Sequence, residues 1–263
     1  MSALATTFAQ GTGRTLLVPY MTVGFPQADS TVALMDALED AGADIIELGV
    51  PFSDPAADGP VIQRANDQAL ANRASLTSAL AAAASYRDGG GKLPVVLMGY
   101  ANPFLRFGPA RLARECNQAG VSGVLAVDWP AGDPDELGAA TGEEGVDRIS
   151  LIAPTTPEER IASIAAKSSG YLYYVSIKGV TGTGKASHSE ALAAAAKIRK
   201  QTGLPIAIGF GISTPQDCAA LAAGFDAVVV GSCLVAAAAA AGSTSAAASA
   251  IGKIVSEMKA ALQ

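Results

Sequence analysis

The chain has 263 residues, of which 50% are hydrophobic and 16% are charged, so it can bury a large core and does not resemble a disordered protein. Its 18 Lys and Arg residues against 24 Asp and Glu residues give a net charge of −6 without a basic cluster, which argues against a nucleic-acid-binding surface. The scattered cysteines and the single histidine lack metal-ligand spacing, so we expect no metal site and reduced thiols in a cytoplasmic protein (Cys116, Cys218, Cys233 and His188).

Eight short runs rich in Val, Ile and Leu recur along the chain, and each is followed by a longer segment with a helical pattern. Runs that are apolar on both faces are typical of parallel strands buried on both sides. We therefore predict strands within Leu16–Val23, Ile45–Val50, Pro94–Tyr100, Gly123–Trp129, Arg148–Ala153, Tyr171–Ser176, Pro205–Phe210 and Ala227–Val230.

A helix that ends at a glycine turn and leads into a strand recurs along the chain, and this is the repeating unit of the fold. It occurs at Ala41–Ile45, Ala119–Gly123 and Ala223–Ala227. Eight such units predict one domain over residues 1–263, a (β/α)8 TIM barrel in the α/β class, with an open doubly wound sheet as the competing architecture. The segment Met1–Arg14 lacks the basic start and apolar core of a signal peptide, and we expect an extra N-terminal helix there. The Ala-rich segment Leu234–Ala250 predicts a helical C-terminal tail.

Two carboxylates stand at the end of the second predicted strand, where a barrel of this kind carries its active site. Glu47 lies inside the apolar run, and burial would raise its pKa and suit it to acid–base catalysis; a purely structural acid is the open alternative. Asp58 lies in a loop stiffened by Pro51, Pro55 and Pro60. From spacing alone, the favoured interpretation of Asp58 is the N-cap of the helix that begins near Pro60.

Glycines follow three neighbouring strands near the end of the chain. Backbone N–H groups can converge where glycines leave room, and the loops after strands seven and eight often bind phosphate in such barrels. Phosphate binding is therefore favoured over ordinary tight turns at Gly179–Gly184, Gly209–Ser213 and Gly231–Ser232. Lys178, at the end of the sixth strand, is the position where an aldolase could form a Schiff base, and it could equally be a solvated or phosphate-steering charge, as could Lys185.

At these residues the chain resembles the tryptophan synthase alpha chain family, from about Leu17 to Leu234. Several long motifs occur in the family's order, which makes the resemblance far more specific than any single glycine pattern. They are Glu47–Ala65, Met98–Pro103, Ala153–Pro157, Tyr173–Ser176 with Gly179–Gly182, and Gly209–Ser213.

The resemblance implies a lyase of tryptophan biosynthesis, grouped with the carbon–oxygen lyases, that splits indole-3-glycerol phosphate into indole and glyceraldehyde 3-phosphate by a retro-aldol cleavage. It implies that Glu47 moves the protons and that Asp58 binds the indole N–H. Thr181 would fix the loop that carries Asp58. By the same resemblance the indole contacts are Tyr20, Met98, Leu125, Tyr173 and Phe210, and the phosphate contacts are Gly182, Gly211, Gly231 and Ser232.

The resemblance further implies a partner, a beta chain that carries pyridoxal phosphate and joins the indole to serine in an α2β2 heterotetramer. No cofactor is expected in the present chain. The implied contacts with the partner are Pro51, Asp54, Pro55, Asn102 and Pro130.

Two loops depart from the family pattern, and both border the expected site. Ala56 replaces a larger apolar residue, and Val23–Pro26 stands where a small residue followed by Gly-Asp-Pro is more common. We expect these departures to affect the kinetics or the coupling to the partner more than the class of reaction. Three other functions stay open at this stage: a stand-alone indole-releasing lyase, an aldolase that uses Lys178, and a non-catalytic regulatory subunit.

Overall fold

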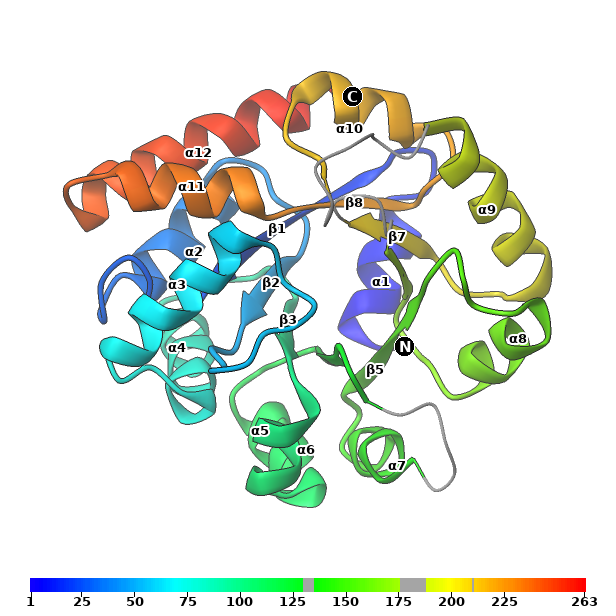
Figure 1. Ribbon diagram of the computed structural model, residues 1–263, viewed down its shortest axis with the longest axis horizontal. Coiled ribbons are helices and arrows are strands. Elements are labelled where there is room, and N and C mark those ends of the chain that lie inside the picture. Colours follow the sequence, from blue (N-terminus) through cyan, green and yellow to red (C-terminus); the bar gives the residue numbers. More distant parts are fainter. Residues whose placement is uncertain (130–134, 176–187, 210) are drawn as a thin grey trace.

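The computed structural model describes residues 1–129, 135–175, 188–209 and 211–263. Eight parallel strands close into a barrel in the order β1 to β8, with β8 returning to pair with β1 (Figure 1). The predicted (β/α)8 barrel is therefore confirmed, and the open sheet is wrong. The strands are β1 Leu16–Thr22, β2 Ile46–Gly49, β3 Val95–Gly99, β4 Gly123–Ala126, β5 Asp147–Ile152, β6 Leu172–Val175, β7 Ile206–Gly209 and β8 Ala227–Val230.

Helices surround the barrel, as Figure 1 shows. Those in the described residues before β5 are α1 Ala3–Gln10, α2 Thr31–Asp40, α3 Pro60–Ala71, α4 Leu76–Asp88, α5 Ala101–Phe107, α6 Pro109–Gln118 and α7 Glu136–Glu143. Those after β5 are α8 Glu158–Ala166, α9 His188–Gln201, α10 Pro215–Ala222, α11 Ser232–Ala240 and α12 Thr244–Ala260.

The apolar side chains form two layers because successive residues of a strand point to opposite faces. One layer fills the barrel, with Val18, Leu125 and Val229 among its members. The other lies between the strands and the helices, with Leu48 and Val228 among its members. This double burial explains why the strands appear in the sequence as continuous apolar runs.

The predicted N-terminal helix is α1, and it covers the end of the barrel where the strands begin. Leu4 and Phe8 of α1 pack into the barrel-filling layer, and the Phe8 ring lies 5.6 Å from the Tyr171 ring between centroids. The helical tail is also confirmed, as two helices. The Ser243 side chain accepts a hydrogen bond from the Ala246 N–H and so starts α12 after a break at Ala241.

Candidate active site

Glu47 points into the barrel from β2 and is fully buried. Its Oε1 accepts a hydrogen bond from the Tyr171 hydroxyl at 3.4 Å, whereas its Oε2 has no hydrogen-bond partner among the residues that the structure describes. Burial raises the pKa of Glu47 to about 8, and the nearby Asp58 charge adds to this, although the Tyr171 hydrogen bond opposes it. The carboxyl group is therefore largely protonated at neutral pH and can donate a proton.

Asp58 lies in the loop between β2 and α3, and it is not the N-cap of α3. Gly59 occupies the cap position and no side chain caps the helix, so the cap interpretation is wrong. The Asp58 Oδ2 instead accepts a hydrogen bond from the Asn66 amide at 3.5 Å. The reason is positional: Asp58 lies one residue before the cap position, and its carboxylate lines the cavity.

The loop that carries Asp58 is held by three neighbouring side chains. The Tyr100 hydroxyl accepts a hydrogen bond from the Ala57 N–H at 3.1 Å, and the Gln63 amide donates to the Asp58 carbonyl oxygen at 2.9 Å. Asn66 also accepts a hydrogen bond from the Phe52 N–H at 3.2 Å, so one buried amide connects the start of the loop to its catalytic end.

The pKa of Asp58 also lies above its ordinary value. Partial burial raises it to about 6, and hydrogen bonds from Tyr100 and Asn66 limit the rise. At neutral pH this carboxyl group is therefore mainly ionised while that of Glu47 is mainly protonated. Two carboxyl groups with pKa values separated in this way can play different roles in one reaction.

Both carboxyl groups face one cavity of about 320 Å³ at the carboxyl ends of the strands. This volume lies in the range of small-molecule sites. Of the predicted residues, Tyr20, Met98, Tyr173, Gly211, Gly231 and Ser232 line it together with the two acids.

Ser232 begins α11 directly after Gly231, so the first N–H groups of that helix lie beside the cavity. A helix N-terminus with free N–H groups favours an anion. Gly211 adopts a φ of +77°, a conformation that side chains rarely tolerate. Gly211 and Gly231 thus line the same cavity as the two carboxylates.

Some predicted residues do not line this cavity. Leu125 is fully buried in the barrel-filling layer, where it pairs in register with Met98 of β3. Four predicted positions lie outside the described residues, as do both candidate lysines; they are Pro130, Thr181, Gly182 and Phe210, with Lys178 and Lys185.

The predicted partner contacts differ in how far they are exposed to solvent. Pro51 and Pro55 are buried in the isolated chain, whereas Asp54 and Asn102 are exposed. The Ser53 hydroxyl donates a hydrogen bond to Asp54. Leu105, on the same helix as Asn102, leaves 48% of its surface exposed, which is unusual for a large apolar side chain here.

Several residues of the site had not been singled out from the sequence. Tyr171 lies two positions before Tyr173, and the strand period of two places both side chains inside the barrel, so this signal was present. Asn66 carried no such signal because it looks like an ordinary polar residue of a helix. Apolar contacts from loops complete the cavity wall, namely Val61, Ile62 and Ile212, together with Val229 of β8.

Comparison with known proteins agrees with this geometry. The family model described as tryptophan synthase alpha chain matches residues 7–263. The tryptophan synthase alpha chain of Chromobacterium violaceum is 47% identical over 263 residues and all of both chains, and that of Dechloromonas aromatica is 48% identical over 89% of this chain and 88% of its own.

Solved structures give the same result. Tryptophan synthase subunit alpha from Legionella pneumophila superposes with a TM-score of 0.90 at 35% identity, covering 100% of this chain and 98% of that one. Tryptophan synthase from M. tuberculosis in an aminoacrylate-bound form superposes with a TM-score of 0.88 at 31% identity, covering both chains completely.

Proposed function

The chain belongs to the tryptophan synthase alpha chain family, and we propose that it cleaves indole-3-glycerol phosphate into indole and glyceraldehyde 3-phosphate. The observation that carries this proposal is one cavity lined by Glu47, Asp58 and the N-terminus of α11, in which burial raises the pKa of Glu47 above that of Asp58. A retro-aldol cleavage of a phosphorylated indole needs these three groups. We further propose that residues 1–263 form one domain.

Glu47 is proposed to move both protons of the reaction. Its carboxyl group donates a proton to C3 of the indole ring, which places a positive charge on the ring. The resulting carboxylate then takes the proton from the hydroxyl group of the side chain as the aldehyde forms. The bond between C3 and the side chain breaks, its electron pair returns to the ring, and Glu47 is protonated again.

Asp58 is proposed to accept a hydrogen bond from the indole N–H. A carboxylate at this position stabilises the positive charge that the ring acquires when C3 is protonated. The pKa of about 6 supports this role because Asp58 is ionised at neutral pH. Thr181 is proposed, from the family resemblance, to hold the loop of Asp58.

The two ends of the substrate are proposed to bind to opposite walls of the cavity. Gly211, Gly231 and Ser232, with Gly182 from the resemblance, would bind the phosphate largely through backbone N–H groups. Tyr20, Met98 and Tyr173 would hold the indole ring, with Phe210 as a further contact from the resemblance. Leu125 would support this wall from below, because it is buried behind Met98.

A beta chain is the partner that the family implies, and we propose an α2β2 assembly in which that chain carries pyridoxal phosphate and receives the indole. The exposed side chains of Asp54, Asn102 and Leu105 are the proposed contacts in the described residues, and Pro130 joins them from the resemblance. Pro51 and Pro55 would act by holding the shape of the loop that connects this surface to Asp58. We also propose a cytoplasmic location, where the intermediates of amino-acid synthesis occur.

No helix in the described ranges of the chain has the length and apolar character needed to cross a membrane.

The direct test is an assay of indole release from indole-3-glycerol phosphate, with and without a beta chain. We expect turnover by the wild type with a beta chain and near-complete loss in Glu47→Gln. Glu143→Gln, an exposed acid on α7, is the matched control and should retain full activity. Full activity in Glu47→Gln, or none in the wild type with a matched beta chain, would refute the proposal.

The same assay separates the other functions. Turnover that does not rise with a beta chain would indicate a stand-alone lyase. Trapping with borohydride in the presence of substrate tests the aldolase, since a covalent adduct on Lys178 would replace the assignment of Glu47.

A further inference from the structure

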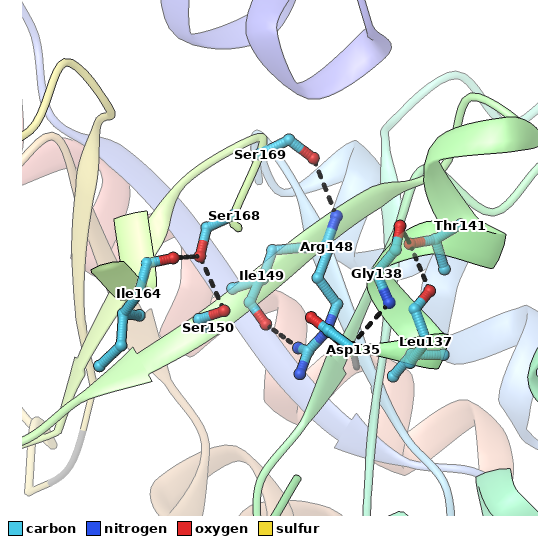
Figure 2. Close-up of polar contacts among 10 residues, drawn as sticks. All are labelled: Asp135, Leu137, Gly138, Thr141, Arg148, Ile149, Ser150, Ile164, Ser168 and Ser169. Carbon is cyan, nitrogen blue, oxygen red and sulfur yellow. Dashed lines mark hydrogen bonds and ion pairs between the residues drawn. The ribbon is translucent and has the colours of Figure 1, made fainter. Parts of the chain in front are cut away.

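The side of β5 that faces the helices carries polar residues, unlike that side of the other strands. Ile149 points into the barrel, so its neighbours Arg148 and Ser150 face the helices (Figure 2). On the other strands the helix-facing positions carry no charge; examples are Leu17, Ile46, Leu97, Val124, Leu172, Ile208 and Val228. An arginine between a strand and its covering helices is costly to bury unless something compensates its charge.

The charge of Arg148 is only partly compensated within the described residues. The residue is 6% exposed, and its Nη1 donates a hydrogen bond to the Ile149 carbonyl oxygen at 2.5 Å. Its Nε is buried and has no hydrogen-bond partner in the described part of the chain, and the Asp135 Oδ2 lies 4.0 Å away. Asp135 is already engaged, because its Oδ1 accepts the Gly138 N–H at 3.0 Å and caps α7 (Figure 2). Burial lowers the pKa of Arg148, but a guanidinium group stays charged at neutral pH.

Arg148 lines a cavity of about 160 Å³ whose described lining is rich in positive charge. Arg160 and Ser163 enter it from one face of α8, and Lys167 enters it from the C-cap of that helix, because residues three and four positions apart share a helix face. Asp135 is the single acid among the described lining residues. Lys167 already has an interaction of its own, so the cations that face the space are Arg148 and Arg160, beside a carboxylate that caps α7.

Ser150 lines the same cavity but offers no free hydrogen-bond donor. The Ser168 Oγ lies 2.7 Å from both the Ser150 Oγ and the Ile164 carbonyl oxygen, so these two contacts use the hydrogens of both hydroxyl groups. Figure 2 shows Ser150 and Arg148 on the same strand, with Ser168 beside Ser150. The donors left for a ligand are therefore those of the guanidinium groups, in a space too small for most metabolites.

From these contacts we propose that the cavity between β5, α7 and α8 binds a small tetrahedral oxyanion, phosphate or sulfate, held by Arg148 and Arg160. A bidentate guanidinium group is a typical ligand of such an anion. The site is distinct from the proposed catalytic phosphate site, since none of its lining residues lines the catalytic cavity.

Trp129 makes the proposal directly testable. It is the single tryptophan of the sequence and it lines this cavity but not the catalytic one. The intrinsic fluorescence of the whole chain is followed while inorganic phosphate replaces chloride at constant ionic strength. We expect a saturable change in Trp129 emission in the wild type, its loss in Arg148→Met, and affinity several-fold weaker in Arg160→Gln. Arg114→Met, which removes an exposed arginine of α6, is the matched control and should bind as the wild type does.

Each outcome decides the proposal. No saturable change in the wild type overturns it, because phosphate then does not enter the cavity. An equally strong change in Arg148→Met also overturns it, because phosphate then acts from another site such as the catalytic cavity. If Arg148→Met does not fold, Arg160→Gln decides: weaker phosphate binding supports the site, and unchanged binding refutes it.

Discussion

Replacing Glu47 by glutamine should remove catalysis and at the same time make the protein more stable above neutral pH. Glu47 is fully buried in the barrel, and one of its carboxylate oxygens lacks a hydrogen-bond partner within the described ranges of the chain. Ionisation is therefore much easier in the unfolded chain than in the folded one. A glutamine of the same shape keeps the contact with Tyr171 and carries no charge at any pH.

The pH window follows from the pKa of Glu47 in the two states. The ordinary value is 4.5 and burial raises it to about 8, so the folded protein holds a proton that the unfolded chain loses between these values. Stability falls with pH wherever the folded state binds more protons, and therefore the wild type loses stability from about pH 4.5 to about pH 8 through this group. At 1.36 kcal/mol for each pH unit, the loss is about 3 kcal/mol at pH 7 and about 5 kcal/mol at pH 9. Glu47→Gln should recover most of it.

The measurement is urea unfolding of the wild type and Glu47→Gln at pH 5, 7 and 9. The difference in the free energy of unfolding should be small at pH 5 and should grow with pH, with the variant more stable. Glu143→Gln, an exposed acid, should show no such trend. A difference that does not change with pH would mean that Glu47 ionises freely in the folded barrel, and the reasoning on its pKa would then be wrong.

Three further substitutions test the site. Asp58→Asn should lower turnover by a factor on the order of 10² while the protein still binds glycerol phosphate. Asp29→Asn, at an exposed acid, is the control. A loss of affinity with normal turnover would contradict the role of Asp58. Asn66→Ala removes a hydrogen bond that lowers the pKa of Asp58. Activity needs ionised Asp58, so the acid limb of the pH–rate profile is expected near pH 6 in the wild type and at higher pH in the variant. An unmoved limb would count against this contact. Gly209→Ala places a Cβ against the Tyr173 hydroxyl oxygen and should lower the free energy of unfolding, measured in urea, by about 1 to 3 kcal/mol. Gly142→Ala is the control, because a Cβ at that position would meet open space. Equal effects of the two substitutions would refute the close packing.

The eight strands could be predicted from the sequence because parallel strands buried on both faces give continuous apolar runs. Each observed strand lies within its predicted run or within one residue of it; β5, for example, begins at Asp147 rather than Arg148. The glycines that end the helices marked the repeat, as at Gly42 and Gly120, which both adopt a positive φ. These features depend on local backbone preferences and on which side chains avoid water, so the order of residues determines them.

The roles of the carboxylates depend on contacts between distant parts of the chain. Spacing favoured a cap for Asp58, and only the positions of Asn66 and Tyr100 show that its side chain faces the cavity. Glu47 meets Tyr171 across 124 positions of sequence, a contact that exists only because the barrel closes.

Arg148 is the clearest case of a residue whose environment depends on contacts between distant segments. In the sequence it begins a predicted apolar strand, and nothing nearby in the chain indicates an unusual environment. Only the packing of β5 against α8 brings Arg160 and Lys167 to the same cavity, and the Arg148 Nε has no partner among the residues described. The order of residues was therefore enough to predict the barrel and its two acids. The pKa values of these acids and the charged cavity depend on how the chain packs, because burial and charge neighbours arise only when distant segments meet.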